Sequence, residues 1–227
     1  FTGQFGFLGT EFLAEGPLSK SGNSSYLVMG RYSTLSIFQS LGIQIGTDNI
    51  PVYGDGAFKF NWRLKNGGML SWCGIGGKSK IDILISDQTT FTDELYGESD
   101  RDQLFGTSMG VTGINYKKSL NEKTYITATL GTSFEEQHTD HIYLNRSLDT
   151  NAQTQEINIT VDSSFNLMSY DFMKAKLTSY FAVNHKFNKR NIIKFGFNAE
   201  GMFMSQKDSI RTSYISTAPF NNRWDYR

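Results

Sequence analysis

The sequence has little of what stabilises small extracellular domains or binds thiolate-held metals. Cys73 is the only cysteine among its 227 residues, so an internal disulfide and a metal site with several thiolates are both excluded. Only three prolines interrupt the chain. Neither charge sign is in excess, since Lys and Arg together number 22 and Asp and Glu also number 22. This balance gives no support for a nucleic-acid partner or for a polybasic membrane tether.

Long apolar runs are missing as well. No stretch approaches the roughly 20 consecutive apolar residues of a membrane-spanning helix, whereas phenylalanine (18), tyrosine (11) and glycine (22) are abundant. A β-barrel escapes this requirement, because only every second residue of its strands faces lipid. The chain opens without an initiator methionine or a signal peptide, and residues 224–227 do not alternate. We therefore expect a piece of a longer protein.

The clearest pattern lies in residues 57–76. Between Phe58 and Leu64, large apolar side chains alternate with cationic and amide side chains, which is the period of a β-strand, and residues 65–68 have turn chemistry. A returning strand follows from Met69. If residues 66–68 form a three-residue loop with a left-handed glycine, Lys65 pairs with Met69. The same register predicts three further pairs: Trp62 with Trp72, Phe60 with Gly74 and Phe58 with Gly76.

The rest of the chain repeats this hairpin pattern. Short turns over residues 17–23, 65–68, 117–123 and 187–191 alternate with long segments over 33–55, 86–104, 136–171 and from 205 onward. Thr34–Leu41 could hold a helical turn, and Glu156–Phe165 could extend a strand. A soluble sandwich could supply such strands but does not explain the regular alternation of connections. The pattern predicts an all-β, antiparallel up-and-down transmembrane barrel segment of about eight strands, with short periplasmic turns and long extracellular loops.

The two parities assign side chains to two environments. A charge that faces lipid at the bilayer midplane costs about 2–4 kcal/mol, so the apolar parity is expected to face lipid and the polar parity to face a lumen. The lipid-facing candidates are Phe58, Phe60, Trp62, Trp72, Phe195 and Phe197. The lumen-facing candidates are Arg31, Lys59, Arg63, Lys176, Lys194, Glu200 and also Asn198. Cys73 shares the parity of Ser71 and is expected to be inert.

Two clusters of polar residues have the composition of a chemical site. Glu135, Glu136, His138, Asp140 and His141 could support acid–base or metal chemistry, but a polar loop gives these side chains no common face, and a solvated loop is the favoured interpretation. The acidic segment Asp87–Asp102 could hold calcium, yet it lacks the spacing of an EF-hand. We therefore predict no catalytic residue, cofactor site or metal site.

Four stretches resemble the barrel of TonB-dependent receptors: E-F-L-A-E-G-P-L-S-K (Glu11–Lys20), Y-L-V-M-G-R-Y-S-T-L-S (Tyr26–Ser36), G-I-G-G-K-S-K-I-D-I (Gly74–Ile83) and V-N-H-K-F-N (Val183–Asn188). The resemblance is to the Bacteroidota subgroup whose chains carry a carboxypeptidase-regulatory-like domain before the plug. It implies an outer-membrane barrel of about 22 strands with an N-terminal plug, which imports bulky nutrients with energy transmitted by TonB.

Residues 1–227 would then be an N-terminal part of that barrel, since they contain no plug and no TonB box. The implied partners are outer-membrane lipid, the plug and remaining strands of the same protein, and TonB through an absent segment. A SusD-like surface lipoprotein is a further partner that the resemblance leaves open. The alternatives are a structural or secretion-associated barrel that does not import and, more remotely, an outer-membrane hydrolase.

The strands near Leu8–Gly16 and Ile192–Met204 are expected not to pair with each other. Closing so few strands would enclose Arg31, Lys59 and other inward cations in a narrow lumen with few carboxylates, which is costly. Each end strand should instead bond to chain outside the segment or remain an unpaired edge.

Overall fold

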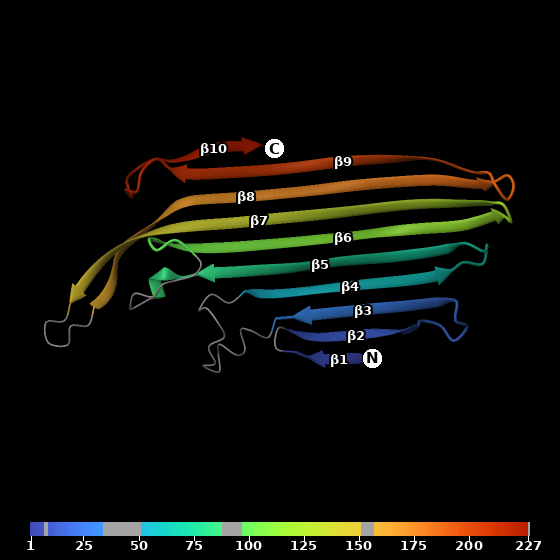
Figure 1. The fold of residues 1–227 in the computed structure, drawn as a ribbon, viewed down its shortest axis with the longest axis horizontal. Helices are drawn as coiled ribbons and strands as arrows, with labels where there is room; N and C mark the ends of the chain where they lie inside the picture. The colour runs from blue at the N-terminus through green and yellow to red at the C-terminus, as the bar shows by residue number, and fades with distance from the viewer. Residues whose placement is uncertain (7–8, 34–50, 88–96, 151–156, 227) are drawn as a thin grey trace.

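A computed structural model describes residues 1–6, 9–33, 51–87, 97–150 and 157–226 of the chain. Ten strands form one sheet, and each strand pairs in antiparallel fashion with its neighbours in sequence (Figure 1). This confirms the all-β, up-and-down architecture. The elements are β1 (Thr2–Phe5), β2 (Thr10–Pro17), β3 (Ser24–Tyr32), β4 (Val52–Arg63), β5 (Met69–Ile83), the short 3-10 helix η1 (Ile85–Asp87), β6 (Arg101–Asn121), β7 (Thr124–Thr150), β8 (Ile157–Lys186), β9 (Ile192–Arg211) and β10 (Phe220–Tyr226).

Successive connections lie alternately at the two ends of the sheet (Figure 1). Two of the expected long segments, near residues 33–51 and 84–100, lie at one end as the sequence predicts, but the connection 151–156 is no longer than the turn 18–23 at the other end. The turn end carries residues 18–23, 64–68, 122–123 and 187–191, and the loop end carries 6–9, 33–51, 84–100, 151–156 and 212–219. Gly22 and Gly67, at the turn end, have φ values of 69° and 79°, a conformation open to glycine without steric cost. The helical turn expected over Thr34–Leu41 lies outside the described residues.

The strands are longer than expected. β7 and β8 contain 27 and 30 residues, so the long segment expected from residue 136 to 171 is mostly strand, and the extension expected near Glu156–Phe165 is confirmed from Ile157. β9 also continues past residue 205, and β6 begins inside the expected acidic loop. With β1 and β10 the sheet has ten strands. The strands were predicted too short because near the loop end polar residues occupy both parities and conceal the alternation. Cross-strand pairs nevertheless stabilise the sheet there, such as Tyr143 with Phe165, whose ring centroids are 5.2 Å apart.

The hairpin β4–β5 keeps the predicted parity but not the predicted register. Its loop is Lys65–Gly67, closed by a hydrogen bond of 2.8 Å from the Leu64 amide to the Gly68 carbonyl. The Asn66 side chain accepts the Gly68 amide at 2.9 Å, which leaves Gly67 in the left-handed position. The observed pairs are Arg63–Met69, Trp62–Leu70, Phe60–Trp72 and Phe58–Gly74, so the predicted pairs Lys65–Met69, Trp62–Trp72, Phe60–Gly74 and Phe58–Gly76 are wrong. A shift of two residues returns every side chain to its expected face.

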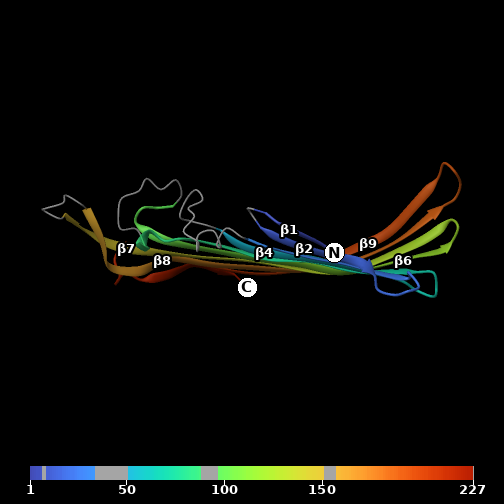
Figure 2. The same ribbon diagram turned by 90° about the horizontal axis from the view of Figure 1, so that it is seen from below.

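The sheet is open. β2 pairs with β1 and β3, and β9 pairs with β8 and β10, which confirms that the two end strands predicted from the sequence do not pair with each other. The edges are instead the short strands β1 and β10. β10 covers β9 only from Gln206 to Arg211, so the outer edge of residues 192–205 has no strand partner among the described residues. Seen edge-on, the sheet is curved, and its turn end bends to one side at β6–β9 (Figure 2).

Candidate functional site

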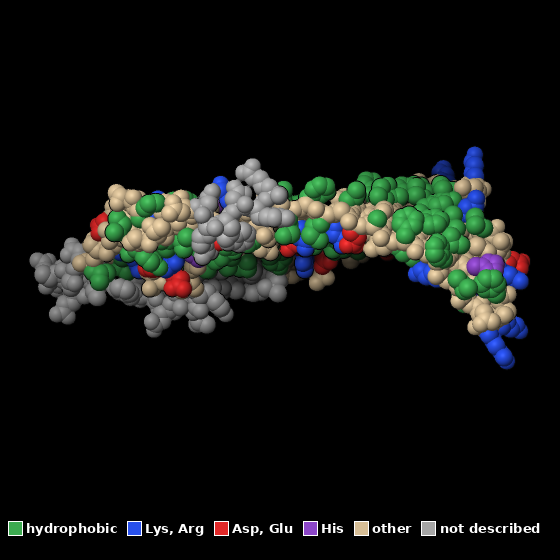
Figure 3. Space-filling model, turned by 90° about the horizontal axis from the view of Figure 1, so that it is seen from above, with side chains coloured by type: hydrophobic (Ala, Val, Ile, Leu, Met, Phe, Trp, Pro, Cys, Tyr) green, Lys and Arg blue, Asp and Glu red, His purple; other side chains and the backbone are tan. Residues whose placement is uncertain are grey.

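The sheet has two chemically different faces. Directly paired residues of antiparallel strands point to the same side, and successive residues point to opposite sides. The observed register therefore aligns residues in rows across the strands, and one row runs through Tyr26, Phe60, Trp72, Ile114, Leu130, Ser179 and Ala199. We call the face of this row the apolar face and the opposite one the polar face. In Figure 3, hydrophobic side chains gather along one side of the turn-end half of the molecule.

The apolar face carries a band without charge. Four consecutive rows, from that of Trp62 and Phe197 to that of Phe12 and Phe203, contain no charged side chain among the described residues. Six residue steps separate the first and last rows, a distance of roughly 20 Å along the strands. We call these rows the charge-free band. Large side chains on this face are exposed, including Phe195 at 76% and Phe203 at 68%.

Aromatic side chains and glycines fit together within the band. The Phe58 and Trp72 rings meet edge to face with centroids 4.8 Å apart, and the Phe58 ring lies over Gly74, where a Cβ would come within 2.6 Å of it. The Trp72 indole N–H donates to the Thr112 hydroxyl at 3.0 Å, so its polar atom is satisfied within the sheet. The structure brings all six aromatic candidates to this face: Phe58, Phe60, Trp62, Trp72, Phe195 and Phe197.

The polar face carries ions at the level of the band and just beyond both of its ends. Arg31 pairs with Asp55 at 2.7 Å, and Lys176 pairs with Glu200 at 2.8 Å. Lys194 lies over the Tyr180 ring, 5.5 Å from its centroid. All six candidates predicted from the polar parity lie on this face: Arg31, Lys59, Arg63, Lys176, Lys194 and Glu200. Asn198 and the exposed Cys73 lie there too.

A mixed belt of charges borders the band on its loop side, still on the apolar face. This belt was not predicted, although the sequence carries a signal for it, because its residues continue the parity of the aromatic residues into the polar part of each strand. Its members are Lys78 and Lys80 on β5, Glu136 and His138 on β7, Asp171 on β8 and Lys207 on β9. The belt therefore marks where the band ends.

The two histidines of the predicted acid–base cluster lie in β7, not in a loop, and on opposite faces. On the apolar face, His138 Nδ1 is 2.5 Å from Asp171 Oδ1 and Nε2 is 3.0 Å from Asp140 Oδ2. The hydrogen bond with Asp171 raises the pKa of His138 above its ordinary value. On the polar face, His141 packs edge-on against Phe105, and burial lowers the pKa of His141. The two imidazoles therefore cannot act on one ligand.

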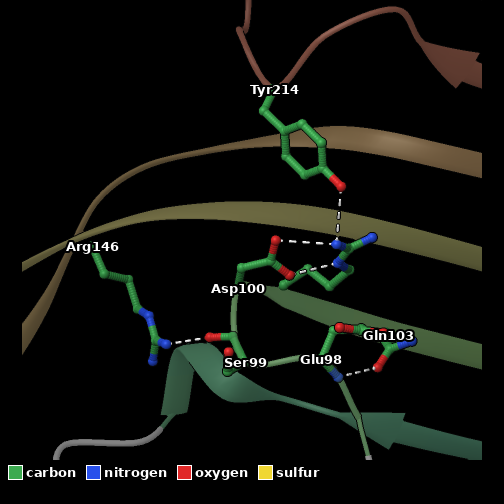
Figure 4. Close-up of polar contacts among 7 residues, drawn as sticks. Glu98, Ser99, Asp100, Gln103, Arg146 and Tyr214 are labelled. Atoms are coloured by element: carbon green, nitrogen blue, oxygen red, sulfur yellow. Dashed lines mark hydrogen bonds and ion pairs between the residues drawn. The ribbon is translucent and has the colours of Figure 1, made fainter.

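Residues 98–100 are held at the loop end by side chains of β6 and β7 (Figure 4). Arg101 donates to both carboxylate oxygens of Asp100, at 2.6 and 3.0 Å, and to the Tyr214 hydroxyl at 3.3 Å. Arg146 of β7 donates to the Ser99 carbonyl, and the Glu98 amide donates to Gln103 Oε1 at 2.9 Å. The described part of this connection is thus an ordered platform.

The acidic segment Asp87–Asp102 does not form a cation site in its described part. Asp100 pairs with Arg101, and Asp102 is 7% exposed and accepts the Ser86 amide at 2.8 Å. Across residues with described positions, no group of three or more His, Cys, Asp or Glu side chains is placed to hold a metal ion.

No protein-family model, curated protein or solved structure matches this chain. No helix in the described parts of the chain is long and apolar enough to span a bilayer.

Proposed function

We propose that this chain forms part of the wall of a transmembrane β-barrel in a bacterial outer membrane, in a transporter of the TonB-dependent receptor type that takes up a bulky nutrient. The observation that carries the proposal is the contrast between the faces. The apolar face has four rows without charge, whereas the polar face carries Lys59, Lys176 and Glu200 at the same level. A barrel wall has this pattern, with an apolar band about 25 Å tall outside and polar side chains inside.

The exposed aromatic side chains support a lipid-covered face. Phe195, Phe197 and Phe203 are 76%, 59% and 68% exposed, and they belong to a contiguous surface rather than to scattered positions. Monomeric soluble proteins rarely expose such extended apolar patches. Lipid hydrocarbon covers the surface in the proposal, and the mixed charges of Lys78, Glu136 and their neighbours then lie at the head-group level.

The open edges support a larger barrel. An unpaired strand edge is untenable within a bilayer, and residues 192–205 of β9 have such an edge in the described structure. In the proposal, further strands of the same protein complete the wall, a plug fills the lumen, and TonB supplies energy through a segment outside residues 1–227. The polar face then lines the substrate pathway, and the loop-end platform forms part of its extracellular mouth.

Spin labels in native envelopes test the membrane assignment. In a Cys73→Ser background, single cysteines replace Phe60 or Phe197 on the apolar face and Lys59 or Asn198 on the polar face. We expect labels at the first pair to collide with lipid-soluble oxygen and labels at the second pair with a water-soluble nickel complex. Equal access of the nickel complex to both faces would refute the membrane assignment.

Import is tested separately in cells. Deletion of the gene should abolish uptake of one class of bulky nutrient, and dissipation of the inner-membrane proton gradient should have the same effect, because TonB-transmitted energy depends on that gradient. A protein that passes the spin-label test but shows no energy-dependent uptake across a nutrient panel is instead a structural or secretion-associated barrel.

A further inference from the structure

The polar face carries an apolar stripe at the level of the charge-free band. One cross-strand row on this face is apolar on five neighbouring strands, β2 to β6, and its members are Leu13, Met29, Ala57, Ile75 and Val111. Leu27 and Met109 extend the row by one level toward the turn end and the loop end, respectively. We call these residues the inner stripe. It spans four inter-strand spacings, or about 19 Å across the strands.

The sheet leaves the inner stripe uncovered. Ile75, Met109 and Val111 are 57%, 51% and 44% exposed, although Ile75 and Val111 lie directly opposite each other on β5 and β6. Contiguous apolar surface of this kind marks an interaction site, whereas singly scattered apolar side chains do not. The methionines suit a contact surface as well, because their unbranched side chains adapt to irregular contours.

Charged residues border the inner stripe on both sides. Toward the loop end, Arg31 pairs with Asp55 at 2.7 Å. Toward the turn end, Glu15 and Lys59 flank Leu27 on the two adjacent strands, and neither has an ion pair among residues with described positions. An apolar centre with a polar rim is the anatomy of a protein–protein interface, and the two unpaired charges offer opposite signs to a docked surface.

The same three levels of the polar face are hydrophilic on β7 and β8. Their residues are Gly131, Ser133, Glu135, Lys174, Lys176 and Thr178, and none has an apolar side chain. Lys176 pairs with Glu200 of β9 at 2.8 Å, and Glu135 lies directly opposite Lys174. This part of the wall therefore balances its own charges and suits contact with water.

The place of the inner stripe restricts what can cover it. In the proposed barrel, lipid covers the opposite face of the same strands, so lipid and a second copy of the protein meet the wall only from outside. The transported nutrient and polypeptide inside the lumen are what can reach the stripe. A nutrient would leave this apolar surface in water between transport events, at a cost proportional to its area, whereas a resident segment keeps it covered.

We propose that the inner stripe is the docking surface for an apolar segment of the protein's own plug, an inference that rests on the proposed function. The segment lies across β2 to β6 and packs its apolar side chains against Met29, Ile75 and Val111. It also presents a carboxylate to Lys59 and a cation to Glu15, which forms charge-assisted hydrogen bonds at the rim. The space along β7 and β8 stays hydrated and forms the path of the nutrient.

Thiol labelling of the full protein in native envelopes tests the docking. In a Cys73→Ser background, a single cysteine replaces Ile75 in the stripe or Thr178 on β8. The sheet alone exposes Ile75 more than Thr178, so an uncovered stripe requires Ile75→Cys to react faster with a water-soluble maleimide. We expect Ile75→Cys to react about tenfold more slowly instead, because burial against apolar side chains raises the pKa of a thiol and lowers its thiolate fraction. Equal or faster reaction of Ile75→Cys would overturn the docking.

A photocrosslinker identifies the covering segment. Benzoylphenylalanine in place of Val111 should crosslink, within the same polypeptide, to a peptide outside residues 1–227, whereas benzoylphenylalanine in place of Thr178 should crosslink only to neighbouring strands. Crosslinks from Val111 only to neighbouring strands, or to a different protein, would overturn the plug as the occupant. Protection of Ile75→Cys that requires added nutrient would also overturn it and would assign the stripe to the substrate.

Two matched variants locate the contact. In the Ile75→Cys protein, Val111→Asp should speed labelling several-fold, because a carboxylate under an apolar segment loses its hydration and loosens the docking. Ser133→Asp adds the same charge in the same row on β7 and should leave the rate unchanged. Equal effects of the two substitutions would overturn the site. The proposed function fails separately: a spin label at Ile75 that collides with lipid-soluble oxygen as often as one at Phe197 would refute the barrel wall itself.

Discussion

Leu177 on β8 offers the sharpest test of what covers the apolar face. Its side chain is 51% exposed and lies inside the charge-free band, opposite Thr132 and Gly201. If water covers this face, Leu177→Arg should change the free energy of unfolding by about 0.5 kcal/mol or less, as exposed substitutions usually do. If hydrocarbon covers it, a cation near the bilayer midplane costs about 2–4 kcal/mol. We expect the larger value.

Two control variants isolate the charge. Thr178→Arg introduces the same cation one residue away, on the polar face and opposite Glu200, so its cost should stay within about 0.5 kcal/mol. Leu177→Ala removes the leucine side chain without adding a charge. The difference between Leu177→Arg and Leu177→Ala is therefore the cost of the charge itself.

The assay is unfolding by guanidinium chloride of the full protein folded into phospholipid vesicles, followed by tryptophan fluorescence, with free energies obtained by linear extrapolation. Equal costs for Leu177→Arg and Thr178→Arg, or a larger cost for Thr178→Arg, would refute the lipid-facing assignment of Leu177. Either result would mean that the parity of the side chains does not separate lipid from water.

Three further substitutions test local structure. A Cβ at Gly74 would lie 2.6 Å from the Phe58 ring, whereas one at Gly201 in the same row meets nothing within 4 Å. We therefore expect Gly74→Ala to lower the free energy of unfolding by about 1–3 kcal/mol in the same assay and Gly201→Ala to lower it much less. Equal costs would contradict the packing of Phe58 over Gly74. The pKa of His138 is raised from 6.5 in the folded state, so its contribution to the free energy of unfolding should be complete below pH 6.5 and be lost as the pH rises through the raised value. His138→Gln should abolish this pH dependence. An unchanged dependence of stability on pH in the variant would count against the ion pairs of His138. Arg101→Gln should speed proteolysis within residues 97–100 several-fold without affecting cleavage at 187–191, and an unchanged rate would show that other contacts fix the platform.

The face to which each side chain points was predictable from the sequence, because it depends only on local alternation along a strand. The register of the β4–β5 pair was not, because it depends on the conformation of a single turn. Gly67 and Gly68 are adjacent, and either could take the left-handed position. The hydrogen bond from the Gly68 amide to Asn66 Oδ1 selects Gly67, and no pattern of apolar residues reports that choice. The two-residue error left Phe58 and Phe60 on the expected face, so the assignment of faces was insensitive to it.

Strand ends were harder to predict than faces. His138 was placed in a loop because polar residues on both parities conceal the alternation there, yet β7 continues through it to Thr150. The ladder beyond the band is stabilised by pairs that include two polar residues, such as Ser147 with Thr160, whose hydroxyls are 2.8 Å apart. Such pairs exist only once the strands have met, so a single strand's sequence does not reveal them.

The ions of the polar face bear on the size of the space that this sheet could enclose. Arg31 and Lys176 have carboxylate partners, but Lys59 and Arg63 have no ion pair among the described residues. A small barrel of about eight strands is filled by its own side chains, and a cation desolvated there without a partner costs several kcal/mol. The ten strands instead form a sheet whose edges do not meet. A wider lumen, filled with water or a plug, keeps Lys59 and Arg63 hydrated or supplies their partners, so the charges and the open edges favour the same larger barrel.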